Sequence, residues 1–364
     1  MTTDVKPGLW ERSLDRRRLL QLLCLAGAGG LGCSTLRMTR ARAANEPETR
    51  DFRIGTGPTS SGYFVIGGII ANAISNPPGS RPCDRGGSCG VPGLIATAQT
   101  TQGSVQNVDL IAGKALDSGL CQSDVAYWRY TGSGMYSDRK PVDSLRAIAN
   151  LYQESLHVIV RADSSIASIA DLAGKRVAIG ERGSGTRATA TLVLDAYGVG
   201  SRKIVGQQLP LATAVESLQQ GAIDAMFVVG GEPIPAIADL AEAVDVRLLA
   251  VDGDKAADLR RQHPFLTIDL IPDGTYRQNR ATITVGVGTY WLVLADLDET
   301  LAYGITTALW HKSTRKLLDE GSAVGRRIRM ENALVGLPIP LHGGAQRYYA
   351  ETRAQGLAPA QGSN

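Results

Sequence analysis

The sequence has little of what membrane proteins and most enzymes need. Its longest apolar run, residues 19–31, holds 13 residues, whereas a membrane-spanning helix needs ~20. Its four histidines stand apart without metal-ligand spacing, and it contains neither a G-x-S-x-G motif nor a Walker loop ending in Lys-Ser/Thr. No acidic pair stands out from the scattered carboxylates. We therefore predict no catalytic residue, no metal and no cofactor.

The N-terminal 43 residues have the pattern of an export signal. Three arginines at 16–18 precede the short apolar run, and Ala-Arg-Ala at 41–43 supplies a cleavage site. Residues 15–21 also resemble a twin-arginine signal, which exports folded proteins, and an ordinary secretory leader is the alternative. We predict a cleaved signal peptide over residues 1–43 and a soluble, periplasmic product.

Removal of this leader changes the charge balance. The whole chain has a net charge of +3, but residues 44–364 hold 30 basic and 32 acidic side chains. The basic character therefore belongs to the leader, and no basic groove with interleaved aromatics remains, so we predict no nucleic-acid partner. The remaining 321 residues suffice for two domains of ~150 residues each.

Three cysteines follow the leader. Cys83 and Cys89 share a glycine-rich loop, and export to an oxidising compartment favours a disulfide between them. One Cys pair with no His nearby in the sequence cannot fill a tetrahedral zinc site. Cys121 lies in an apolar strand and is predicted to be a buried small hydrophobe. Within the leader, Cys33 would suit a lipoprotein, but Gly30 replaces the Leu usual three positions before it.

Strand, glycine-rich turn and helix alternate along the rest of the chain. Strands are predicted at 52–55, 94–100, 119–121, 156–160, 176–180, 225–229 and 285–294, and helices at 63–74, 104–116, 187–197, 212–220, 298–318 and 345–352. This alternation predicts parallel sheets with helices on their faces. Residues 54–74 and 177–197 repeat the same order, which favours two similar lobes. The C-terminal helices would pack on the first lobe, so the chain would cross between lobes near residues 150 and 290.

The turn at 183–187 is the sharpest candidate for binding. It opens a predicted helix, so backbone N–H groups and the positive end of the helix would meet there and suit an anion. Arg187 would pair with a carboxylate through two hydrogen bonds. Capping of the helix by Ser184 or Thr186 would explain the same residues.

Other polar residues stand at strand ends or in apolar runs. Gln122 ends a buried strand and is predicted to contact a ligand, because α/β sites open at that edge. Asp124 is predicted to be the N-cap of the next helix. Tyr63 would offer a ring and a hydroxyl to a ligand or else pack in the core. His157 lies in an apolar run and is predicted to be a core residue with its hydrogen bonds satisfied.

A series of motifs runs in order from about residue 52 to about residue 350. They are IGTG at 54–57, GSVQN at 103–107, CQSDVAY at 121–127, SIADLAGKRV at 168–177, GSGTR at 183–187, GAIDA at 221–225, GGEP at 230–233 and ENALVGLPIPLH at 331–342. Together they resemble the TAXI class of solute-binding receptors of TRAP transporters. The first loop departs from that family's usual Gly-Gly-Thr-Tyr-Tyr, since residues 58–64 read PTSSGYF.

The resemblance implies an α/β fold of the type II periplasmic-binding-protein kind, with the ligand in a cleft between two lobes joined by two hinge strands. Lobe 1 would hold residues 44–150 and 290–364, and lobe 2 residues 151–289. It also implies a monomer that captures a small anion, glutamate-like, glutamine-like or another small carboxylate, and delivers it to a TRAP permease without catalysis. Ligand contacts would come from Tyr63, Thr101, Ser104, Asn107, Gln122, Ser123, Ser184, Gly185, Thr186, Arg187 and Gly231. A periplasmic ligand sensor, or a transferase holding phosphate at 183–187, are the alternatives.

Overall fold

The computed structural model describes residues 48–200 and 202–355. Its strands are β1 (Arg50–Gly55), β2 (Ser75–Asn76), β3 (Val91–Pro92), β4 (Leu94–Gln99), β5 (Ser118–Gln122), β6 (Leu145–Arg161), β7 (Arg176–Ala178), β8 (Val205–Gln207), β9 (Ala225–Gly230), β10 (Val246–Leu248), β11 (Leu266–Ile271) and β12 (Thr282–Leu294). Its α-helices are α2 (Gly62–Ile74), α3 (Ser104–Ala112), α4 (Ser123–Thr131), α5 (Gly185–Ala196), α6 (Leu211–Gln219), α7 (Pro235–Ala243), α8 (Gly253–Gln262), α9 (Glu299–Leu309), α10 (Lys312–Gly321) and α11 (Gly343–Ala354). None of these helices is long and apolar enough to cross a membrane. The predicted signal peptide lies outside the described residues.

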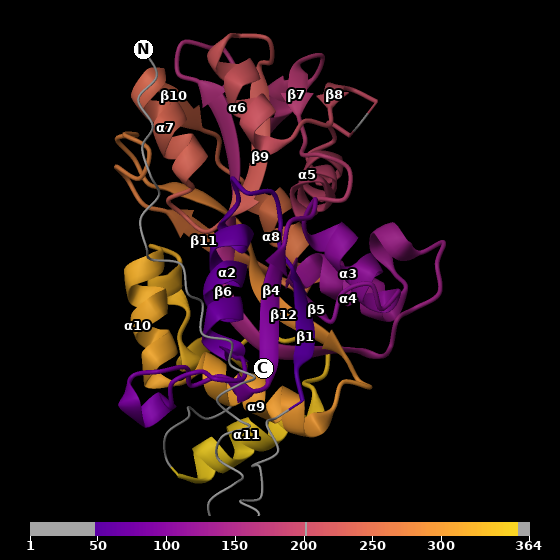
Figure 1. The fold of residues 1–364 in the computed structure, drawn as a ribbon. Coiled ribbons are helices and arrows are strands. Elements are labelled where there is room, and N and C mark those ends of the chain that lie inside the picture. The colour runs from indigo at the N-terminus through magenta and orange to yellow at the C-terminus, as the bar shows by residue number, and fades with distance from the viewer. Residues whose placement is uncertain (1–47, 201, 356–364) are drawn as a thin grey trace, which may run out of the picture. The chain divides into compact units, whose positions relative to one another are not determined.

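A ten-stranded mixed sheet organises most of these elements, and β2 and β3 form a separate two-stranded sheet (Figure 1). The order of the larger sheet is β4-β1-β5-β12-β6-β9-β7-β8, with β10 paired to β6 and β11 paired to β12. β1 runs parallel to β4 and β5, and β7 runs parallel to β8 and β9. Between these groups, β12 and β6 run antiparallel to each other. The predicted α/β fold class, with parallel strands and crossover helices, is confirmed.

The two parallel groups repeat one pattern of connection. In the first, the chain passes β1-α2-β4-α3-β5, and in the second it passes β7-α5-β8-α6-β9. In both groups the first strand lies between the second and the third. The repeat predicted from residues 54–74 and 177–197 therefore has a matching arrangement in the sheet.

β6 is far longer than the strand predicted at 156–160. Polar residues such as Asn150 and Glu154 break its apolar pattern, yet both are buried because β12 and β9 cover the strand as its neighbours. Asn150 is the register partner of Tyr290 in β12. The two predicted crossing points, near residues 150 and 290, thus lie opposite each other in adjacent strands. The division into two lobes itself stays a prediction.

The C-terminal helices pack on the first parallel group, as predicted. Ile54 of β1 and Ile66 of α2 share a buried apolar cluster with Ile305 of α9, Leu318 of α10 and Tyr349 of α11. Figure 1 shows α10 beside α2. Burial of these side chains, at ~25 cal/mol per Å² of apolar surface, holds the C-terminal segment against β1 and α2.

Candidate functional site

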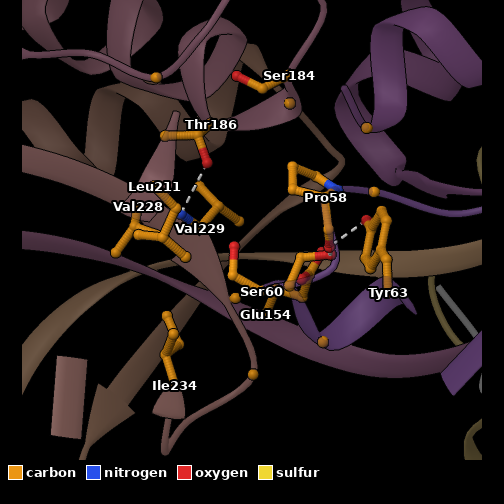
Figure 2. Close-up of a pocket in the computed structure, with 18 of the residues that line it drawn as sticks. Pro58, Ser60, Tyr63, Glu154, Ser184, Thr186, Leu211, Val228, Val229 and Ile234 are labelled. Atoms are coloured by element: carbon orange, nitrogen blue, oxygen red, sulfur yellow. Dashed lines mark hydrogen bonds between the residues drawn. The ribbon is translucent and has the colours of Figure 1, made fainter. Parts of the chain in front are cut away.

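A cavity of about 580 Å³ lies where loops and helix starts meet (Figure 2). The loop after β1 (residues 57–61), the start of α5 and the end of β9 all contribute to its lining. Strand ends and helix starts gather at this place because in each β-turn-α unit the helix begins where its strand finishes. The volume falls within the usual range for small-molecule sites, ~300–1,000 Å³.

Five helices begin at this cavity. Its lining includes Gly62 of α2, Ser104 of α3, Gly185 of α5, Leu211 of α6 and Pro235 of α7, each the first residue of its helix. The first N–H groups of a helix have no partner within the helix and carry a partial positive charge. These N–H groups, of which Pro235 has none, bring partial positive charge to a cavity whose lining also includes the acidic side chains of Glu154 and Glu181.

Seven of the predicted contact residues line the cavity. They are Tyr63, Ser104, Gln122, Ser184, Gly185, Thr186 and Gly231. The first loop lines it as well, through Pro58, Thr59 and Ser60. The departure from the TAXI pattern in this loop therefore falls on the cavity wall.

Thr101 and Asn107 do not line the cavity, which corrects their predicted placement. The Asn107 amide donates to the carbonyls of Thr56 (2.6 Å) and Leu120 (2.8 Å), and its oxygen accepts from the Thr101 hydroxyl (2.7 Å). Asn107 is fully buried. Asn107, on the face of α3 that packs on the sheet, ties the end of β1 to β5, and Thr101, in the loop before α3, supports its amide.

Ser123 is also absent from the lining. Its hydroxyl donates to the carbonyl of Phe265 (3.3 Å) and accepts from the N–H of Gly288 (3.1 Å). As the first residue of α4 it points toward β12 and the segment before β11 rather than toward the cavity. Its predicted ligand contact is therefore replaced by a structural role.

Arg187 faces a different cavity, of about 880 Å³, together with Arg182 and Arg139. Successive residues of a helix point ~100° apart. Thr186 is held toward β9 by the N–H of Val229, which donates to its hydroxyl (3.1 Å), and Arg187 consequently turns away. Arg187, which we predicted to bind a ligand carboxylate through its side chain, therefore does not line the first cavity.

The turn before α5 is shaped by close contacts. Ser184 is the N-cap, and its hydroxyl accepts from the N–H of Arg187 (3.2 Å). This capping role was the structural alternative for Ser184 and is confirmed. Gly183 has φ +89°, which other residues rarely adopt, and a Cβ on Gly185 would lie 1.7 Å from Oε1 of Gln122. Both glycines are therefore needed for this turn.

Behind the cavity lies a buried polar chain. The Gln122 amide donates to the Thr189 hydroxyl (3.0 Å), which donates to a carboxylate oxygen of Asp124 (2.8 Å). Burial raises the pKa of Asp124 to about 6.

Asp124 is not the N-cap of α4, because the helix already begins at Ser123, and the N-cap is Gln122. The carboxylate instead accepts from the N–H of Val125 within the first turn.

Glu154 lines the cavity and was missed from the sequence. It lies in the middle of β6, is 3% exposed and accepts a hydrogen bond from the hydroxyl of Tyr63 (2.8 Å). Burial raises the pKa of its carboxyl to about 7, although the Tyr63 bond opposes this shift. The one signal in the sequence was a Glu inside an otherwise apolar stretch, residues 145–161.

The cysteine and histidine predictions are settled by direct contacts. Cys83 and Cys89 form the predicted disulfide, with a Cα–Cα distance of 4.7 Å. His311, distant in the sequence, lies close to both sulfurs, but sulfurs in a disulfide are not the thiolates that bind metals. Cys121 is buried and unpaired, and His157 is buried with both ring nitrogens hydrogen-bonded, to the Ser155 carbonyl and the Tyr276 hydroxyl.

Residues 54–352 match the model of the NMT1-like family, and the chain belongs to that family. Among solved structures, it is similar to the alkanesulfonate-binding protein SsuA from Xanthomonas axonopodis pv. citri bound to MOPS (18% identity, 86% of this chain and 96% of that chain, TM-score 0.44). It is also similar to the periplasmic aliphatic sulphonate binding protein SsuA from Escherichia coli (14% identity, 85% and 89%, TM-score 0.41). A third is the substrate binding protein of an amino acid ABC transporter (17% identity, 75% and 99%, TM-score 0.42).

Proposed function

We propose that this protein is a periplasmic solute-binding receptor that encloses a small molecule in the 580 Å³ cavity and delivers it to a membrane transporter. The observation that carries this proposal is the meeting of five helix starts at one cavity. Such a site binds through fixed backbone dipoles.

The ligand in this proposal carries a carboxylate, as the resemblance to the TAXI class implies. The lining residues include no Lys, Arg or His, so the backbone must supply the anion contacts. Ser184 caps α5 through the N–H of Arg187, and no hydrogen bond among the described residues uses the N–H groups of Gly185 or Thr186. Those two N–H groups, at the positive end of α5, are the proposed carboxylate contacts.

The transporter in this proposal is a TRAP permease, the partner that the motif series implies. Release would follow opening of two lobes, residues 44–150 with 290–364 and residues 151–289. The hinge would lie in β6 and β12, because these are the strands that continue across the middle of the sheet. Hinge motions of this kind need few residues to change their backbone angles.

A thermal and calorimetric screen of the exported protein tests the proposal. Small carboxylates and amino acids are added singly, and a true ligand at ~100 times its Kd should stabilise the fold by ~2.7 kcal/mol. Gly185→Val is the blocking variant, because even its Cβ would overlap Gln122. Arg187→Ala is the matched control from the same turn, and it should bind normally. Absence of any ligand in the screen, and in native mass spectra of the protein as isolated, would refute the receptor function.

A further inference from the structure

Glu154 is an incompletely satisfied carboxylate at the cavity wall. One of its oxygens accepts from Tyr63 (2.8 Å). Among the described residues a second donor, the hydroxyl of Thr289, lowers the pKa of the carboxyl without reaching full hydrogen-bond geometry. The side chain is 3% exposed and lines the cavity. Buried carboxylates are ordinarily paired with a cation or with several donors. The free oxygen therefore leaves room for one more donor, and the cavity is where that donor can enter.

Among the described residues no cation forms an ion pair with Glu154; Arg327 lowers the pKa of its carboxyl but is paired with Glu232. The acidic residues Glu154 and Glu181 line the cavity, and no basic side chain joins them. Burial without a paired cation is the reason that the pKa of Glu154 is raised. A ligand group that is positively charged, or that donates strong hydrogen bonds, would offset the cost of burying the Glu154 carboxylate. The attraction between the two groups would be strong because the dielectric constant of a buried site is low.

The opposite wall of the cavity is apolar. Leu211, Phe227, Val228 and Ile234 line it, from α6, β9 and the start of α7. Figure 2 shows Leu211, Val228 and Ile234 on one side, and Tyr63 with its hydrogen bond to Glu154 on the other. A highly polar ligand body, such as the side chain of glutamate, would leave its second carboxylate facing either these apolar groups or Glu154.

We infer that Glu154 selects the ligand: the solute presents a protonated amine to the free oxygen of Glu154 and packs an apolar body against Leu211, Phe227 and Ile234. The inference rests on the proposed receptor function and narrows its ligand. Combined with a carboxylate at the start of α5, it describes an amino acid or related zwitterion with an apolar side chain. A glutamate-like dianion would instead place its second carboxylate beside Glu154 or against the apolar residues, so we expect it to bind more weakly.

Isothermal titration calorimetry with four probes tests this inference. Three of the probes each lack one group of the fourth, L-phenylalanine. L-Phenylalanine has the amine, the carboxylate and the apolar body, 3-phenylpropanoate lacks the amine, 2-phenylethylamine lacks the carboxylate, and L-glutamate lacks the apolar body. We expect L-phenylalanine to bind at least tenfold more tightly than 3-phenylpropanoate or L-glutamate. This comparison uses the unaltered protein, so it does not depend on whether a variant folds.

Glu154→Gln keeps the shape of the side chain and removes its charge. We expect it to weaken L-phenylalanine binding by ~100-fold, because loss of one partner from a buried charge pair has effects of this order, and to leave 3-phenylpropanoate binding unchanged. Glu216→Gln, an exposed residue of α6 outside the cavity lining, is the matched control and should bind L-phenylalanine normally. Tighter binding of L-glutamate than of L-phenylalanine, or equal L-phenylalanine affinity in Glu154→Gln, would overturn the inference while leaving a receptor in place. Binding of none of the four probes would also overturn it, and the broader solute screen would then decide the receptor function separately.

Discussion

The buried carboxyl of Glu154 should make the stability of the ligand-free protein depend on pH. Its pKa is about 7 in the folded chain, against ~4.3 in an unfolded one. A raised pKa means that folding favours the protonated form. The resulting stability is fully present below pH ~4.3 and is lost as the pH rises toward 7. At 1.36 kcal/mol per pKa unit, the loss is about 3–4 kcal/mol.

Glu154→Gln isolates this effect. His157 titrates in the opposite sense, because burial lowers its pKa to about 4, so its contribution grows as the pH rises from 4 to ~6.5. Asp124, with a pKa of about 6, adds a loss of the same sign as that of Glu154. Tyr63, Thr289 and Arg327 also influence the pKa of the Glu154 carboxyl. Since the variant retains all of these groups, the difference between it and the unaltered protein reports Glu154 alone.

The assay is urea unfolding of both proteins without ligand at pH 4.5 and pH 7.5. We expect the free energy of unfolding of Glu154→Gln, relative to the unaltered protein, to rise by about 3 kcal/mol between the two pH values. If the free energy of unfolding falls with urea concentration at the same slope in both proteins, their denatured states are comparable. A relative stability that stays constant across this range would show that Glu154 is not held in a desolvated, cation-free setting.

Three further predictions concern the turn, the disulfide and the second cavity. Ser184→Ala removes the N-cap of α5 and should lower the free energy of unfolding by ~1 kcal/mol in urea titrations, with Thr191→Ala on the same helix as the comparison. Replacing Cys83 and Cys89 together by Ser opens a short loop and should lower it by ~2 kcal/mol, which the shift in thermal midpoint of the oxidised protein would measure. Arg187→Ala should change the Kd for a ligand of the 580 Å³ cavity less than twofold, because Arg187 lines the 880 Å³ cavity instead. A loss of affinity of tenfold or more in calorimetry would show that Arg187 does contact the ligand.

The sequence by itself determined the features that depend on neighbouring residues. The alternation of apolar runs with glycine-rich turns predicted the α/β class, and the repeated order at 54–74 and 177–197 predicted two similarly connected groups of strands. Cys83 and Cys89 lie six positions apart in the sequence, so their pairing needed only the oxidising compartment implied by the leader. Ser184, Gly185 and Thr186 could be placed at the cavity because a turn that opens a helix fixes its own geometry.

Tertiary structure alone decided which side chains reach the cavity. Glu154 lies in a strand whose length and burial come from its neighbours β12 and β9, residues more than 60 positions away in the chain. Arg187 is a single position beyond Thr186, yet the rotation of α5 sends it to another cavity. Asn107 fits a binding motif, but α3 lies against the sheet, and the Asn107 amide already donates hydrogen bonds to two backbone carbonyls there. Local pattern specifies where a turn or a helix begins, whereas the direction of each side chain depends on how that helix or strand packs against distant parts of the chain.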